Sequence, residues 1–175
     1  SDGWESPIVI MFVDIVGCSE ISNHEKLKNY NDILRQFRDI FDKITKKHEE
    51  EFYKDEVAIV FQSEVRGDEG CLMIFRKAEG DVKKEDLWAW AADIDTAINI
   101  ALDFKRRWLL SEYNKKRIDS GRLPSDIAVG IHFGQAYINK TDDVQRPYRP
   151  EGYAINLTKR VESHSREGTF THIDI

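Results

Sequence analysis

The stretch PIVIMFVDIVG, residues 7–17, is an almost unbroken apolar run in which β-branched residues are frequent. Such a run is typical of a strand that is buried on both faces inside a sheet. It contains a single acidic residue, Asp14, close to its end. We therefore expect a central strand whose last residues carry a carboxylate.

Helix-like and strand-like patterns follow this strand in mixed order. Apolar residues recur at helical spacing over about 24–49, after a capping residue at Ser22 or Asn23, and again over about 85–117. The remaining expected elements are a hairpin of strands over 56–61 and 71–75, two strands within 127–139 that turn near Gly134, a short helix over 152–165 and a last strand over 169–175. This order predicts an α+β fold with a mostly antiparallel sheet covered by helices.

The composition is that of one ordinary globular domain. The chain has 175 residues, of which 41% are hydrophobic and 33% are charged, and its formal net charge is −6. We expect a single domain over residues 1–175 with a flexible N-terminus over 1–7. The negative charge disfavours general nucleic-acid binding, and no apolar run reaches roughly 20 residues, the length that crosses a membrane. Two cysteines without metal-ligand spacing predict a protein of the reducing cytoplasm.

The segment EVRGDEG, residues 64–70, places four charged residues in the expected turn between two strands. On its own this pattern is typical of a solvated turn, since Gly67 and Gly70 permit positive φ. Asp68 and Asp14 converge, however, if their strands are neighbours, and two carboxylates at one site repel unless a cation lies between them. Mg²⁺ or Mn²⁺ is the natural ion, because hard divalent ions bind carboxylate oxygens and leave room for phosphate.

Two further groups of residues fit the chemistry of a nucleotide. Gly17, Cys18 and Ser19 lie where the next helix begins, and their backbone N–H groups would face a phosphate there. Asn156 and Arg160 are four residues apart and share one face of the last helix. Asn hydrogen-bonds a sugar and Arg neutralises charge on a phosphoryl group, although a surface pair on an amphipathic helix has the same spacing.

Four motifs, FVDIVGCS, RGDEGCLMIF, VGIHFGQAYIN and GYAINLTKRVES, together resemble the class III nucleotide cyclases, the adenylate and guanylate cyclase catalytic domain. The resemblance runs from residue 8 to about 175 and keeps the family's motif order. It implies a ferredoxin-like βαββαβ core and a head-to-tail homodimer with nucleoside triphosphate sites at the interface. It also implies that Asp14, Asp68 and the carbonyl of Ile15 hold two Mn²⁺ or Mg²⁺ ions. Asn156 and Arg160 would come from the other protomer, Asn156 to orient the ribose and Arg160 to stabilise the transition state.

The resemblance also locates two base-reading positions, Glu64 and Arg149. Adenylate cyclases have Lys with Asp or Thr there, and guanylate cyclases have Glu with Cys, so this chain has neither pair. Arg149 can only donate, which argues against adenine, but hydrogen-bond counting leaves guanine, uracil and cytosine open. The size of Arg149 and the long approach to the second strand at Tyr53 favour a shortened pocket and a pyrimidine.

A small domain with RGDE at the hairpin and an arginine at the second base position is similar to the pyrimidine cyclases of bacterial Pycsar anti-phage systems. This similarity implies synthesis of cyclic UMP, or next cyclic CMP, which a separate effector protein reads. The family's phosphate-gripping lysine has no direct counterpart, and the candidates to replace it are Lys140, Lys159 and Arg166. The alternatives are a guanylate or adenylate cyclase and a catalytically inactive nucleotide-binding or interaction domain. A diguanylate cyclase is disfavoured, because VDIVGCS and NLTKR have no counterpart there.

Overall fold

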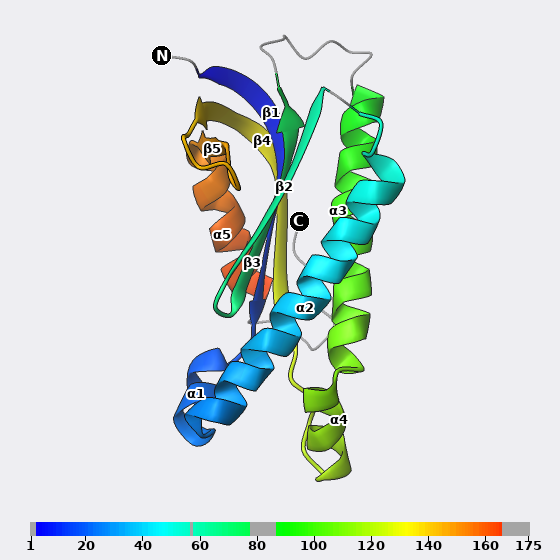
Figure 1. Cartoon of the computed structure of the whole chain (residues 1–175), viewed down its shortest axis with the longest axis vertical. Coiled ribbons are helices and arrows are strands. Elements are labelled where there is room, and N and C mark those ends of the chain that lie inside the picture. The colour runs from blue at the N-terminus through cyan, green and yellow to red at the C-terminus, as the bar shows by residue number, and fades with distance from the viewer. Residues whose placement is uncertain (1–2, 57, 78–86, 166–175) are drawn as a thin grey trace.

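The computed structural model describes residues 3–56, 58–77 and 87–165, and it contains one antiparallel sheet with helices on both faces (Figure 1). In chain order the elements are β1 (Trp4–Ile15), α1 (Cys18–His24), α2 (Leu27–Phe52), β2 (Ile59–Arg66), β3 (Glu69–Arg76), α3 (Leu87–Leu109), α4 (Glu112–Asp119), β4 (Ile127–Lys140), β5 (Tyr148–Glu151) and α5 (Tyr153–Ser165).

β1 lies in the middle of the sheet, as its apolar sequence predicts. The strand order is β2-β3-β1-β4-β5, and every neighbouring pair is antiparallel. β1 pairs with β3 from Ile8 to Asp14 and with β4 over its whole length. The α+β prediction is therefore confirmed, and the order of the first four strands is that of a ferredoxin-like core.

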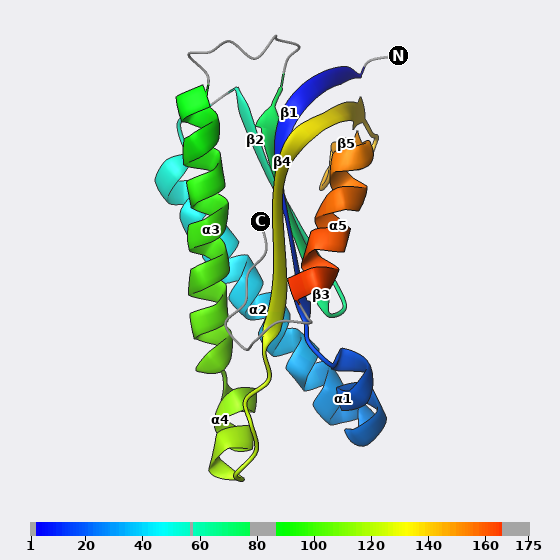
Figure 2. The same ribbon diagram turned by 180° about the vertical axis from the view of Figure 1, so that it is seen from behind.

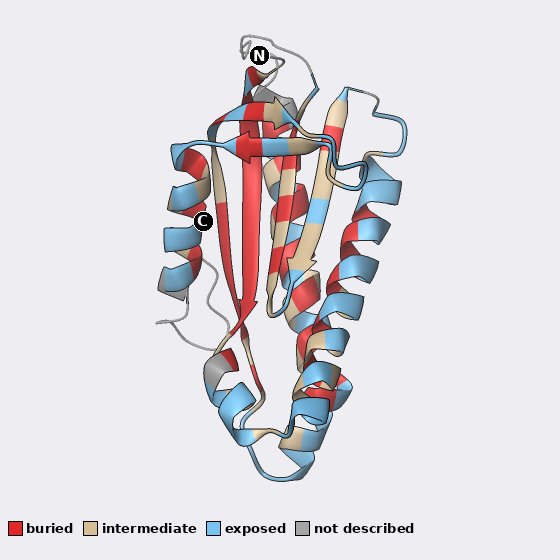
Figure 3. Cartoon of the chain, turned by 60° about the vertical axis from the view of Figure 1, so that its left-hand side comes forward, coloured by how far each residue is buried: buried red, intermediate tan, exposed pale blue. Residues whose placement is uncertain are grey.

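Successive residues of each strand point to opposite sides of the sheet, and each side has its own apolar core. Odd-numbered residues of β1 pack against α2 and α3, where the rings of Phe37 and Phe104 lie edge to face, 5.2 Å apart. Even-numbered residues such as Ile8 and Phe12 join a second core that includes Ala154 of α5. Figure 2 shows α3 and α5 on opposite sides of the sheet, and Figure 3 shows the buried central strands. We call the two sides the two-helix face and the α5 face.

Two predictions about strands are corrected. The sequence predicts a flexible N-terminus over 1–7, but β1 begins at Trp4, whose indole is buried and donates to the carbonyl of Arg76 at 3.0 Å. The predicted turn near Gly134 is replaced by continuous strand, because β4 runs through this residue. Gly134 permits close packing instead: a Cβ there would lie 3.0 Å from the Cβ of Ala154 on α5.

The predicted lengths of other elements also change. The helix predicted over about 24–49 runs from Leu27 to Phe52 as α2, and the short helix α1, which was not predicted from the sequence, precedes it across the extended residues Glu25 and Lys26. The second predicted long helix divides into α3 and α4, because Ser111 caps α4 by accepting a hydrogen bond from the backbone N–H of Asn114. β2 starts and ends later than predicted and continues to Arg66 in register with β3. The predicted last strand over 169–175 lies outside the described residues.

Candidate active site

The end of β1 and the tip of the β2–β3 hairpin lie side by side. Asp14 stands opposite Glu69 in the register of β1 and β3, and the backbone N–H of Ile15 donates to the carbonyl of Asp68 at 3.2 Å. Asp14 is buried, whereas Asp68 is partly exposed at the turn. The structure therefore brings together the two aspartates that the sequence predicts as a pair.

Cys18 packs next to these aspartates. Its thiol is buried and lies 3.3 Å from the hydroxyl of Tyr30. Burial raises the pKa of Cys18 to about 11, and the negative charges of Asp68 and Asp14 add to the increase. The raised pKa disfavours the thiolate, which is the form that binds metal ions, so the sulfur of Cys18 is not a candidate metal ligand. Gly17 precedes it with a φ of 71° and begins α1 without a side-chain cap.

The oxygen donors at this corner fit Mg²⁺ or Mn²⁺. Asp14 and Asp68 supply carboxylates next to the backbone of Ile15, and all of these groups are hard ligands. Within 3–56, 58–77 and 87–165, no group of three or more His, Cys, Asp or Glu side chains forms a metal site. Because Mg²⁺ is commonly held by one or two carboxylates together with substrate phosphates, two aspartates suffice for an ion that binds with a nucleotide.

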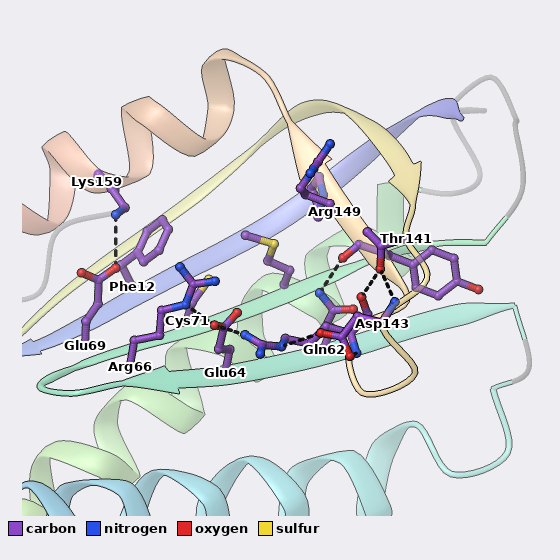
Figure 4. Close-up of a pocket in the computed structure, with 14 residues that line it drawn as sticks. Phe12, Gln62, Glu64, Arg66, Glu69, Cys71, Thr141, Asp143, Arg149 and Lys159 are labelled. Atoms are coloured by element: carbon purple, nitrogen blue, oxygen red, sulfur yellow. Dashed lines mark hydrogen bonds and ion pairs between the residues drawn. The ribbon is translucent and has the colours of Figure 1, made fainter. Parts of the chain in front are cut away.

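A pocket of about 420 Å³ lies on the α5 face, between the β2–β3 hairpin, the β4–β5 loop and α5 (Figure 4). Its volume is in the range of small-molecule sites. Lys159 lies at one end, with its ammonium group 3.3 Å from Glu69 and 5.1 Å from the ring centre of Phe12. The aspartate pair adjoins this end, since Asp68 precedes Glu69. Of the predicted replacements for the phosphate-binding lysine, Lys159 lines the pocket and Lys140 does not, while Arg166 lies outside the described residues.

Glu64 is held between two guanidinium groups in this pocket. Arg66 of β2 and Arg146 of the β4–β5 loop both donate to its Oε1 atom (Figure 4). Arg149 lines the same pocket, but its Nε lies 3.1 Å from Glu151 and its side chain is 68% exposed. The sequence predicts Arg149 as the arginine that acts with Glu64, but in the structure Arg66 and Arg146 contact Glu64 instead.

Tyr53 lies on the other side of the sheet. α2 continues to Phe52 and places Tyr53 on the two-helix face, where its ring centre is 5.2 Å from that of Phe61. Its hydroxyl donates to Asp93 at 2.8 Å. Contrary to the expectation from sequence, the chain does not bring Tyr53 together with Glu64, because Tyr53 packs with Phe61, which points to the opposite side of β2 from Glu64.

Asn156 and Arg160 are exposed on α5. The same helix packs on the sheet through Ala154 and Thr158, which are buried. The predicted pair therefore stays together on the outward part of the helix, and neither residue lines the pocket described above. Asn156 and Arg160 are therefore accessible to a ligand or to another protein chain.

Sequence reasoning missed Gln62 and Arg146, which both line the pocket. Gln62 lies two residues before Glu64 and therefore on the same face of β2. Strand alternation would have identified it had the strand been extended beyond residue 61. Arg146 contacts Glu64 across 82 residues of sequence, a separation at which no local pattern predicts contact.

The sequence matches the family model described as the adenylate and guanylate cyclase catalytic domain over residues 4–172. The chain belongs to this cyclase family. Comparison of the cyclase with curated proteins finds no match. None of its described helices is both long enough and apolar enough to cross a bilayer.

Solved cyclase structures share the fold. The adenylyl cyclase CyaB from P. aeruginosa is 19% identical, with a TM-score of 0.65 over 94% of this chain and 74% of that one. The guanylate cyclase domain of RhGC from Catenaria anguillulae, in complex with GTP, is 20% identical with a TM-score of 0.61, over 93% and 75% of the two chains. A guanylyl cyclase domain from Blastocladiella emersonii, described as a non-canonical dimer, is 18% identical with a TM-score of 0.60, over 93% and 77%.

Proposed function

We propose that this cyclase domain converts UTP, and less well CTP, to the 3′,5′-cyclic mononucleotide and pyrophosphate. The observation that carries the choice of base is the engagement of Glu64 by Arg66 and Arg146 in the pocket. With both guanidinium groups on one carboxylate oxygen, Glu64 acts as a positioning residue for arginines whose remaining N–H groups face the ligand.

Arginine donors select bases that present carbonyl oxygens. Uracil has two carbonyl oxygens, whereas cytosine and guanine each have one and adenine has none. Arg146 and Arg149 line the pocket and can donate but not accept. Adenine offers ring nitrogens as acceptors, but its amino group needs an acceptor that Arg146 and Arg149 cannot supply, so the pocket supports uracil best.

The reacting end of the site would use Asp14, Asp68 and the carbonyl of Ile15 to hold two Mg²⁺ or Mn²⁺ ions. Divalent ions bound there would supply positive charge to the triphosphate and make the ribose 3′-hydroxyl more acidic. The 3′-oxygen would bond to the α-phosphorus as its proton passes to solvent water, and the bond from that phosphorus to the oxygen that bridges it to the β-phosphate would break to release pyrophosphate.

Backbone and cationic groups of the chain would hold the rest of the nucleotide. The N–H groups of Gly17, Cys18 and Ser19 are proposed to face the phosphates. Lys159 is the proposed replacement for the family's phosphate-binding lysine, because it lines the pocket next to the aspartate end. Asn156 would orient the ribose.

The proposed site is completed by a second copy of the chain. Arg160 would stabilise the negative charge that develops on the transferred phosphoryl group, yet it is exposed on α5 together with Asn156. An exposed pair on one protomer is available to the aspartate end of another, which fits a head-to-tail homodimer with two shared sites.

The test of the reaction is incubation of the purified protein with ATP, GTP, CTP and UTP separately, in Mg²⁺ and in Mn²⁺, with products resolved by mass. We expect cyclic UMP as the main product and cyclic CMP as the minor one. Cyclic GMP or cyclic AMP as the main product would retain the cyclase chemistry and refute the choice of base. Binding of nucleotide without any product would favour the inactive binding domain.

As part of the same proposal, the cyclic pyrimidine serves as a second messenger in bacterial anti-phage defence and is read by a separate effector protein. The similarity of the RGDE hairpin and Arg149 to pyrimidine cyclases of such systems supports this role. Nucleotide extracts of bacteria that express the protein should gain cyclic UMP after phage infection. An unchanged level during infection, with an enzyme that is active in vitro, would contradict the defence role.

A further inference from the structure

We infer that Gln62 is a specificity-determining residue whose Oε1 atom accepts a hydrogen bond from the N3–H group of uracil and thereby separates UTP from CTP. This inference rests on the proposed function and adds the residue that distinguishes the two pyrimidines.

The orientation of the Gln62 side chain is fixed by the chemistry of its neighbour. Its Nε2 group donates to the backbone carbonyl of Tyr148 at 3.0 Å. A carbonyl oxygen can only accept, so rotating the amide by half a turn would place two acceptors against each other. Gln62 therefore keeps Oε1 on the side away from Tyr148.

The Oε1 atom of Gln62 is buried and has no hydrogen-bond partner among the described residues. The side chain lines the pocket, and its partner across the strands is the apolar residue Met73, which offers no donor. A buried acceptor without a donor is costly and rare in native proteins. A ligand that presents an N–H group at this position would satisfy it.

The residues that line the pocket together with Gln62 include the kinds of donor that the pairing edge of uracil requires. That edge carries a carbonyl oxygen, an N–H group and a second carbonyl oxygen in sequence. Arg146 and Arg149 of the same pocket supply donors, and Gln62 supplies an acceptor. In cytosine, N3 carries a lone pair and no hydrogen. It would place one acceptor against another, the Oε1 atom of Gln62, and this contact is unfavourable.

Two substitutions at this residue separate recognition from structure. Gln62→Leu removes both the acceptor and the hydrogen bond to Tyr148, whereas Gln62→Glu keeps an acceptor and loses that hydrogen bond. The quantity to measure is the ratio of kcat/KM for UTP to kcat/KM for CTP. We expect Gln62→Leu to lower this ratio about tenfold, the equivalent of one lost hydrogen bond, and Gln62→Glu to keep a preference for UTP.

The matched control is Gln135→Leu, which changes an exposed glutamine of β4 that does not line the pocket and should leave the ratio unchanged. A wild-type ratio in Gln62→Leu would overturn the inference. An equal loss in both Gln62 variants would also overturn it, because the residue would then act only through Tyr148. If the wild-type enzyme forms no cyclic pyrimidine at all, the proposed function itself fails, which is a result visible before any variant is made.

Discussion

Replacing Gly130 by alanine should displace α5 and with it the proposed catalytic pair Asn156 and Arg160. Gly130 lies on β4, where the sheet meets the helix. A Cβ at this position would lie 2.7 Å from the Cα of Glu162 and 2.8 Å from its Cβ. The close atoms include helix backbone, so a side-chain rotation cannot relieve the overlap.

The size of the effect follows from this geometry. Carbon atoms pack at roughly 3.5 Å or more, so the helix must move by about 1 Å to accept the added methyl group. Overpacking of this kind costs about 1–3 kcal/mol of stability. A displacement of about 1 Å in a catalytic group lowers turnover on the order of 100-fold, so Gly130→Ala should lose activity while it remains folded.

The assay combines urea unfolding with the rate of cyclic nucleotide formation. The matched control is Gly121→Ala, because Gly121 has a φ of 77° and open space around its Cα, so alanine there strains the backbone without touching α5. We expect the control to lose some stability and to keep its turnover. A Gly130→Ala protein that is folded and turns over at the wild-type rate would refute the claim that the packing of α5 against β4 positions Asn156 and Arg160.

Three further outcomes are expected. Asp68→Ala should lower turnover on the order of 100-fold or more while size-exclusion chromatography still shows dimers, because it removes half of the carboxylate pair; wild-type turnover would rule out the proposed metal site. Arg146→Ala should lower kcat/KM for UTP about tenfold and Arg149→Ala less, because Arg146 contacts Glu64 and Arg149 is largely exposed; the reverse order would contradict the pocket account. Burial lowers the pKa of His48 below its usual 6.5, so below that pH the unfolded chain binds a proton that the folded chain resists. Urea unfolding at pH 7.5 and 5.5 should therefore show a larger loss of stability toward acid in the wild type than in His48→Gln, and equal losses would contradict this assignment.

The fold was predictable where one residue pattern had one explanation. The apolar run around Asp14 fits only a central strand, and β1 occupies the centre of the sheet. Gly134 was harder to interpret, because a glycine permits a turn and also a close contact. In the structure it serves the second purpose, with α5 packed against it.

The closeness of the two aspartates was predictable from the sequence, and the lining of the pocket was less so. Asp14 and Asp68 come from strand ends that pair directly, so neighbouring strands are enough to bring them together. The second strand predicted from the sequence ends at residue 61, which places Gln62 in the polar turn. A strand face that lines a pocket carries polar residues, so it lacks the apolar pattern by which a core strand is recognised. Arg146 depends on the position of a loop far along the chain, and only the folded sheet places it on Glu64.

The central claim is that each active site combines the aspartates of one protomer with α5 of another. Mixing Asp14→Ala and Arg160→Ala proteins tests it most directly, because a mixed dimer would contain one site with both residues intact. Each variant alone should be inactive, and an equal mixture should recover about a quarter of wild-type activity, since half of the dimers are mixed and each has one working site. Activity no higher than that of the separate variants, in a mixture shown to contain mixed dimers, would contradict the shared site.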